Sequence, residues 1–83
     1  MDIRYSQYEY ETDGNGRFLL VTIVGPNAEE CGGHLFEVLS GESLSVLDDN
    51  TARVVLRPSP GTNLHALEAV AFNEVARWSA ANT

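Results

Sequence analysis

The chain has 83 residues, 43% of them hydrophobic and 20% charged, values typical of one small globular domain spanning 1–83 and not of a disordered segment. Twelve acidic side chains against five basic ones give a formal charge of −7. Because all five bases are arginines scattered along the chain, this balance excludes the basic surface that direct nucleic-acid binding requires.

The cysteine count and the hydropathy pattern bear on location. Cys31 is the single cysteine, so no disulfide can form within the chain, which suits a reducing cytoplasm. The first residues have neither the basic nor the apolar segment of a signal peptide. The longest apolar run is far shorter than the roughly 20 residues that cross a bilayer. We therefore expect a cytoplasmic protein that does not enter a membrane.

The N-terminal quarter of the chain is predicted to form a β-hairpin, with strands over 3–12 and 17–24. Between them, 13–16 reads Asp-Gly-Asn-Gly, and glycine and asparagine accept the positive φ angles that tight hairpins require. Residues 25–26, Gly-Pro, end the second strand because proline has no N–H to donate to a neighbouring strand.

Residues 27–41 are expected to contain a helix with Asn27 as its N-cap. The pair 32–33 is Gly-Gly, and each glycine inside a helix costs about 1 kcal/mol relative to alanine. This cost predicts a helix that is bent, or that begins only at His34. Gly41 is predicted to end the helix as the C′ residue.

The second half of the chain repeats this layout. Strands are predicted over 43–47 and 52–57, joined by a turn at 48–51. Asn63 is expected to cap a final helix over 64–80, whose narrow apolar stripe should face the sheet. The stripe consists of Leu64, Leu67, Ala71, Val75 and Trp78.

The order of elements predicts an α+β two-layer sandwich, ββαββα, in which two helices cover one face of a four-stranded, mainly antiparallel sheet. The strand 17–24 lacks the polar alternation of a strand with one wet face, so both of its faces should be covered. Bulky Phe18 suits the core. We therefore assign Leu19, Val21 and Ile23 to the open face, as a surface that contacts a second chain.

The first strand adds two further groups to the predicted interaction site. Glu9 and Glu11 project from one face with Asp13, about 7 Å apart, at roughly half the charge density of one strand of duplex DNA. A solvated strand face is the ordinary interpretation, and imitation of nucleic acid is the alternative. Tyr8 and Tyr10 share the other face, where they serve either partner contact or cross-strand packing.

Cys31 and His34 form the one grouping that resembles a reactive site. A thiol near a helix N-terminus can be activated by a neighbouring imidazole, yet no carboxylate is evidently placed to orient His34. Together they make half of a zinc site, which only His65 is available to complete. A buried cysteine acting as a small hydrophobe is the ordinary interpretation. We predict neither a metal nor another cofactor.

These features favour a small, acidic, non-enzymatic protein-binding domain that forms a homodimer or binds a larger, basic protein. Immunity proteins, antitoxins and phage-encoded antagonists of host defence share this general profile, although no sequence motif supports the comparison. The alternative is an accessory structural subunit or homodimeric module of a housekeeping complex. A thiol-dependent enzyme using Cys31 and His34 is the more remote alternative.

Overall fold

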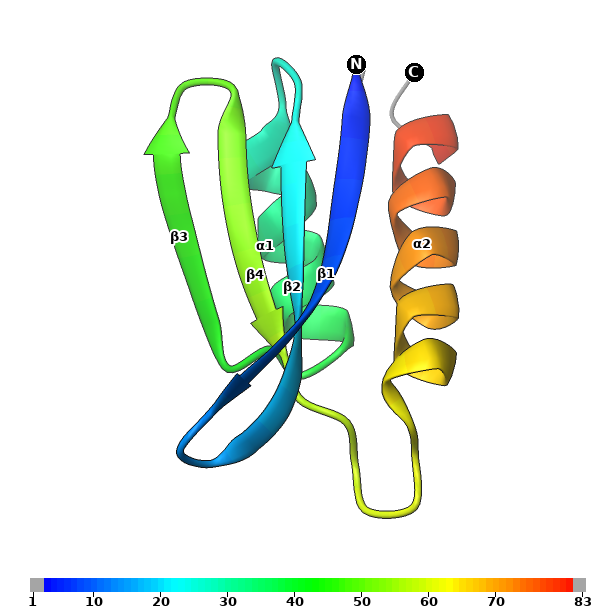
Figure 1. Ribbon diagram of the computed structural model, residues 1–83. Coiled ribbons are helices and arrows are strands. Elements are labelled where there is room, and N and C mark those ends of the chain that lie inside the picture. The colour runs from blue at the N-terminus through cyan, green and yellow to red at the C-terminus, as the bar shows by residue number, and fades with distance from the viewer. Residues whose placement is uncertain (1–2, 82–83) are drawn as a thin grey trace.

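The computed structural model of the protein describes residues 3–81, and the end pairs 1–2 and 82–83 of the predicted domain lie outside it. The elements follow the predicted order ββαββα, and the α+β class is confirmed (Figure 1). They are β1 (Tyr5–Asp13), β2 (Gly16–Val24), α1 (Ala28–Val38), β3 (Ser43–Asp48), β4 (Thr51–Leu56) and α2 (Leu64–Ala81).

The four strands form one sheet in the order β1-β2-β4-β3, and every neighbouring pair is antiparallel. Helix α1 packs on β2, β3 and β4, whereas α2 packs on β1 and β2 and contacts α1. Both helices lie on the same side of the sheet (Figure 1). The sheet therefore has one face covered by helices and one open face.

The turns of both hairpins are stabilised by the same side-chain to backbone hydrogen bond. The Asp13 carboxylate accepts a hydrogen bond from the Asn15 backbone N–H at 2.8 Å, and Asp48 does the same for Asn50 at 2.8 Å. Aspartate favours turns for this reason, because its side chain satisfies a backbone donor two residues further on. An Asp-x-Asn motif is thus common to the two halves of the chain.

The hydrophobic core lies between the sheet and the two helices. The predicted stripe on α2 is confirmed, since three of its members are buried and Leu67 and Trp78 pack against them half-buried. The core residues are Leu19, Val21, Ile23, Ala28, Cys31, Leu35, Ala52, Val54, Leu56, Leu64, Ala71 and Val75.

Helix α1 is continuous from Ala28, so the expected late start at His34 is wrong. Gly32 is buried, and a Cβ atom there would lie 3.0 Å from Leu44 Cδ1 and 3.3 Å from Ala52 Cβ. The missing side chain lets α1 approach β3 and β4 closely. Packing against the sheet therefore outweighs the helix-propensity cost of about 1 kcal/mol.

The C-terminus of α1 differs by one residue from the prediction. Ser40, and not Gly41, adopts the left-handed conformation with φ 53°. The Gly41 N–H donates to the Phe36 carbonyl at 2.7 Å, which closes a Schellman motif. Gly41 is needed for space instead, because a Cβ there would lie 2.8 Å from Phe36 Cδ2 and 3.2 Å from its Cα.

The two predicted N-caps have different outcomes. Asn63 caps α2 as expected, since its Oδ1 accepts the Ala66 backbone N–H at 2.7 Å. Asn27 occupies the N-cap position of α1, but its side chain makes no capping hydrogen bond. The first turn of α1 instead carries Glu29 and Glu30, which favour the positive end of the helix dipole.

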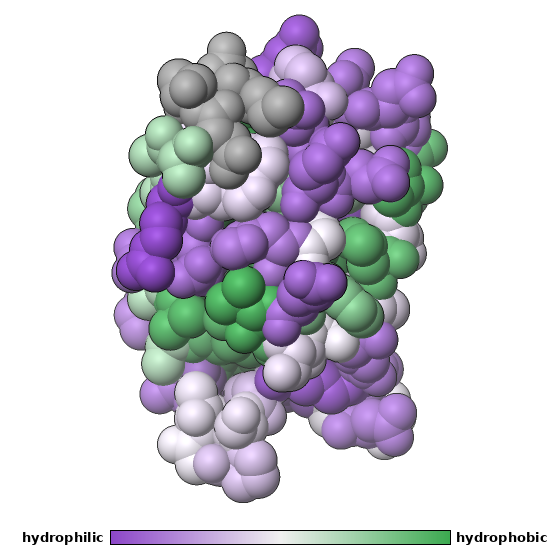
Figure 2. All heavy atoms as spheres, turned by 180° about the vertical axis from the view of Figure 1, so that it is seen from behind, coloured by the Kyte–Doolittle hydropathy of each residue, from purple (hydrophilic) through white to green (hydrophobic). Residues whose placement is uncertain are grey.

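Seen from behind, the helix side of the molecule is largely hydrophilic, with separate apolar patches to the lower left of centre and along the right edge of the view (Figure 2). Val38 of α1 and Val70 of α2 are among the exposed apolar side chains of the helix layer. Neither helix of the described residues is long and apolar enough to cross a membrane.

The contact of α1 with the sheet makes a matched pair of substitutions informative. Gly32→Val should lower the free energy of unfolding by about 1–3 kcal/mol, because overpacking pushes α1 off β3 and β4. Gly33→Val should change it by less than about 0.5 kcal/mol, since nothing lies within 4 Å of a Cβ there. Urea denaturation of both variants measures the difference, and equal losses would contradict the proposed close approach.

Candidate interaction surface

The structure reverses the predicted assignment of the two faces of β2. Leu19, Val21 and Ile23 are 0% exposed and lie in the core beneath the helices. The prediction that these three form an exposed contact surface is therefore wrong. Their partners on β4 explain the outcome, because these three pairs are entirely apolar: Leu19↔Leu56, Val21↔Val54 and Ile23↔Ala52.

The open face carries the other set of β2 side chains. Phe18, Leu20 and Val24 are half-buried there, together with Val55 of β4. Arg53 stands opposite Thr22 on this face, and a charged side chain at that position is incompatible with a helix-covered core. The alternation of residues 51–57 was therefore the sequence signal that distinguishes the two faces.

The acidic ladder of β1 lies on the open face. Glu9 pairs with Leu20 and Glu11 with Phe18, so both carboxylates border the apolar centre of the face. Both are exposed, and within residues 3–81 neither takes part in an ion pair. Their charge is thus available to a partner.

The third member of the ladder is neutralised by Arg57. Its guanidinium forms an ion pair with Asp13 and a second one with Glu42 at 2.6 Å, and it lies 5.1 Å from the centroid of the Phe18 ring. The hydrogen bond from Arg57 lowers the pKa of Asp13, and the bond to Asp13 raises the pKa of Arg57. This cluster covers the hairpin end of the open face.

The tyrosines do not form one cluster. Tyr8 and Tyr10 share one side of β1 as predicted, and this is the helix side, whereas Tyr5 pairs with Val24 on the open face. The Tyr10 hydroxyl donates to Glu68 of α2 at 2.5 Å, and this hydrogen bond raises the pKa of Tyr10. Arg17 lies 5.9 Å from the centroid of the same ring, away from the acidic ladder.

Tyr8 packs the middle of β1 against α2. Burial raises the pKa of Tyr8, and its hydroxyl oxygen accepts a hydrogen bond from Ser6 Oγ at 2.9 Å. Its ring lies 6.1 Å from that of Phe72 at an angle of 55°, a tilted arrangement that aromatic pairs favour. Tyr8 and Tyr10 therefore hold α2 against β1.

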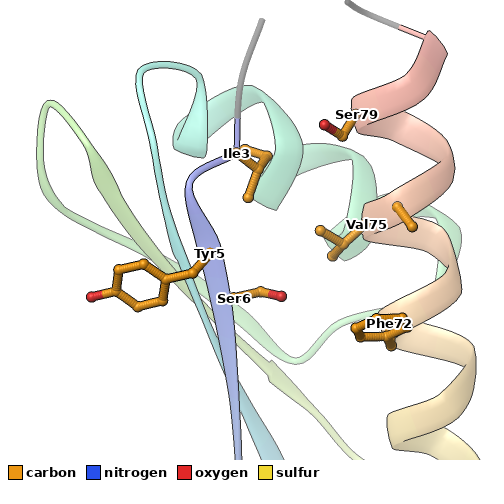
Figure 3. Close-up of a pocket in the computed structure, with 7 residues that line it drawn as sticks. Ile3, Tyr5, Ser6, Phe72, Val75 and Ser79 are labelled. Carbon is orange, nitrogen blue, oxygen red and sulfur yellow. The ribbon is translucent and has the colours of Figure 1, made fainter.

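A groove separates the first part of β1 from α2. Its volume is about 180 Å³, and Ile3, Ser6 and Val75 point toward it, whereas the Tyr5 ring points away (Figure 3). Phe72 extends from α2 toward β1 at one end of the groove (Figure 3). The complete lining is Ile3, Tyr5, Ser6, Phe72, Val75, Ala76 and Ser79.

Cys31 and His34 lie in different environments. Cys31 is 1% exposed, and burial raises the pKa of its thiol to about 11. His34 Nε2 lies 3.1 Å from Glu74 Oε1, so α2 supplies a carboxylate partner 40 residues away that the sequence did not reveal. Burial disfavours the thiolate, which is the reactive form of cysteine. The described residues also hold no group of three metal-ligating side chains.

Comparison of the chain with protein-family models, with curated proteins and with solved structures gave no match. The proposed function therefore rests on the geometry and charge of this chain's own residues.

Replacement of Thr22 by an apolar residue of similar shape is expected to stabilise the protein. Its side chain is buried at 6% exposure on the open face, and its Oγ1 has no hydrogen-bond partner among the described residues. Thr22→Val should raise the free energy of unfolding by about 1 kcal/mol, because it removes a buried, unpaired hydroxyl at nearly constant shape. Thermal and urea denaturation measure the change. Exposed Thr12→Val serves as the control, and a loss of stability specific to Thr22→Val would contradict the prediction.

The environment of Cys31 predicts low thiol reactivity. In the folded protein at pH 8, a thiol-specific reagent should react about a hundredfold more slowly than with the urea-unfolded chain, since the raised pKa leaves little thiolate. The native rate should still be rising with pH above 9, toward the pKa of about 11. A rapid native reaction that levels off below pH 8 would instead indicate an activated thiol.

Proposed function

We propose that this chain is a non-enzymatic protein-binding domain that uses the open face of its sheet. The observation that carries the proposal is the apolar centre of that face, formed by Phe18, Leu20, Val24 and Val55, which no element of the described chain covers. A sheet face with apolar side chains in its middle and polar ones around them has the composition of a protein interface.

The charge distribution supports a basic partner. The chain carries a formal charge of −7, and the carboxylates of Glu9 and Glu11, which form no ion pair within residues 3–81, border the apolar centre. Such a field speeds encounter with a positively charged surface and suppresses association with acidic ones. We therefore favour an inhibitor or antagonist of a larger basic protein, of the immunity, antitoxin or phage anti-defence type, acting in the cytoplasm.

A structural subunit or homodimeric module is the second candidate, and the half-buried apolar side chains of the open face favour it. In that case the acidic surface serves solubility, and the apolar contact holds the complex together. Salt distinguishes the two candidates, because screening weakens exposed charge interactions and leaves apolar contacts largely intact. Binding that survives high salt favours the subunit or module, whereas binding that salt abolishes favours the acidic antagonist.

A substitution at the centre of the open face tests the proposal. Leu20→Arg should reduce partner capture from host lysate at least about tenfold, because removal of a central contact commonly costs more than 1 kcal/mol of binding. Val70→Arg introduces the same side chain on the helix layer and should leave capture unchanged. Affinity purification with mass spectrometry gives the partner, and light scattering at micromolar concentration gives the oligomeric state.

Two outcomes would contradict the proposal. The first is a monomeric protein that captures the same proteins whether residue 20 is leucine or arginine. Where Leu20→Arg also loses the folded circular-dichroism spectrum, Leu20→Gln replaces it and supplies the second outcome. Unchanged capture by folded Leu20→Gln then rejects the open face.

A further inference from the structure

The two edges of the sheet differ in how accessible they are to another strand. At one edge, β3 has six residues and a register shift between Val46 and Asp48, an irregularity that discourages further pairing. At the other edge, β1 has nine residues that pair with β2 without interruption. Within residues 3–81 no strand pairs with the outer side of β1. The sheet thus presents one long, regular edge.

Helix α2 lies along that edge. It packs on β1 and β2, whereas α1 packs on β2, β3 and β4. In Figure 1, α2 runs alongside β1 at the margin of the sheet. A strand added beside β1 would therefore have α2 as its neighbour on the helix side.

The surface of α2 beside β1 carries an exposed aromatic ring. Phe72 is 57% exposed and borders two hollows. One is the groove of about 180 Å³ described above (Figure 3), and the other has a volume of about 240 Å³. The second hollow is lined by His65, Glu68, Ala69, Phe72 and Asn73. A strand added beside β1 would bury Phe72 beneath its helix-side residues.

The two faces of β1 define which strand fits. An added strand alternates its side chains between the faces. On the helix side they meet Tyr8, Tyr10 and Phe72, which favour apolar side chains. On the open side they meet Glu9 and Glu11, which favour lysine or arginine.

A second copy of the chain is a poor occupant of this edge. Antiparallel pairing of two β1 strands about their centre would set Glu9 of one chain opposite Glu9 of the other, with both Glu11 carboxylates nearby. Like charges directly opposite each other destabilise a strand pair. The same carboxylates instead attract a basic strand.

We propose that β1 binds an extended segment of a partner protein as a fifth strand, and that this segment alternates basic and apolar residues. The inference rests on the proposed protein-binding function and names the edge and the partner chemistry that serve it. Backbone hydrogen bonds along β1 supply general affinity, and the alternating contacts on the two faces supply selectivity.

The test uses synthetic peptides and the whole protein. A capped nine-residue peptide alternating lysine and valine matches the length of β1. It should bind and slow amide hydrogen exchange along β1, as followed by nuclear magnetic resonance. A peptide of the same composition with its lysines in one block should bind at least about tenfold more weakly, as should an alternating peptide carrying N-methyl groups on one edge.

Protein variants locate the site. Glu9→Lys with Glu11→Lys should weaken binding of the alternating peptide about tenfold, and Phe72→Ala should weaken it with the charge unchanged. Glu29→Lys with Glu30→Lys makes the same change of charge in the first turn of α1 and should have a much smaller effect. The fold of each variant is checked by its amide spectrum.

Four results would overturn the inference. They are no binding of the alternating peptide at β1, equal binding of the alternating and block peptides, slowed exchange at β3 in place of β1, and a homodimer whose β1 amides are already protected without peptide. None of these depends on partner capture through Leu20. Loss of capture by Leu20→Arg with no peptide bound at β1 therefore retains the proposed function and rejects strand addition alone.

Discussion

The pairing of β2 with β4 is the constraint on which the rest of this structure depends. In the observed register Leu19, Val21 and Ile23 each face an apolar residue of β4, so one face of the central strand pair is continuously apolar. Both helices pack on that face because it is where they can bury their own apolar stripes. The pairing thereby decides which face of the sheet is left open.

The same register orders the outer strand. Since β1 pairs with β2 without a bulge, Tyr8 and Tyr10 follow the core face and reach α2, while Glu9 and Glu11 follow the open face. A shift of one residue would exchange these two sets. The register in the centre of the sheet therefore determines that the aromatic side chains of β1 face α2 and its acidic side chains face the open side.

Charge on the open face is distributed unevenly. Arg57 pairs with both Asp13 and Glu42 and covers Phe18, so the acidic charge at the hairpin end of that face is partly compensated. Further along β1, Glu9 and Glu11 have no such partner among the described residues. The uncompensated acid, the apolar centre and the unpaired edge of β1 consequently lie next to one another, and the proposals above build on this arrangement.

Local signals in the sequence were sufficient for the order and type of all six elements, and for the approximate bounds of the four strands and α2. Turn residues marked both hairpins, and the spacing of apolar residues predicted α2 with its Asn63 cap. The low helix propensity of glycine led to a wrong predicted start for α1. The close contact of Gly32 with Leu44 and Ala52, which offsets that cost, exists only once the helix lies on the sheet. Propensity is a local quantity, whereas this close approach is a tertiary one.

The amino-acid sequence by itself determined the α+β class, the alternation that keeps Glu9 and Glu11 apart from Tyr8 and Tyr10, and the acidic charge. Only the tertiary structure decided which side of β2 is buried, that Glu74 reaches His34, and that α2 packs on β1 and β2. The physical reason is that an all-apolar strand suits either face equally. The choice is made by its neighbours, and here Arg53, opposite Thr22, is excluded from the core.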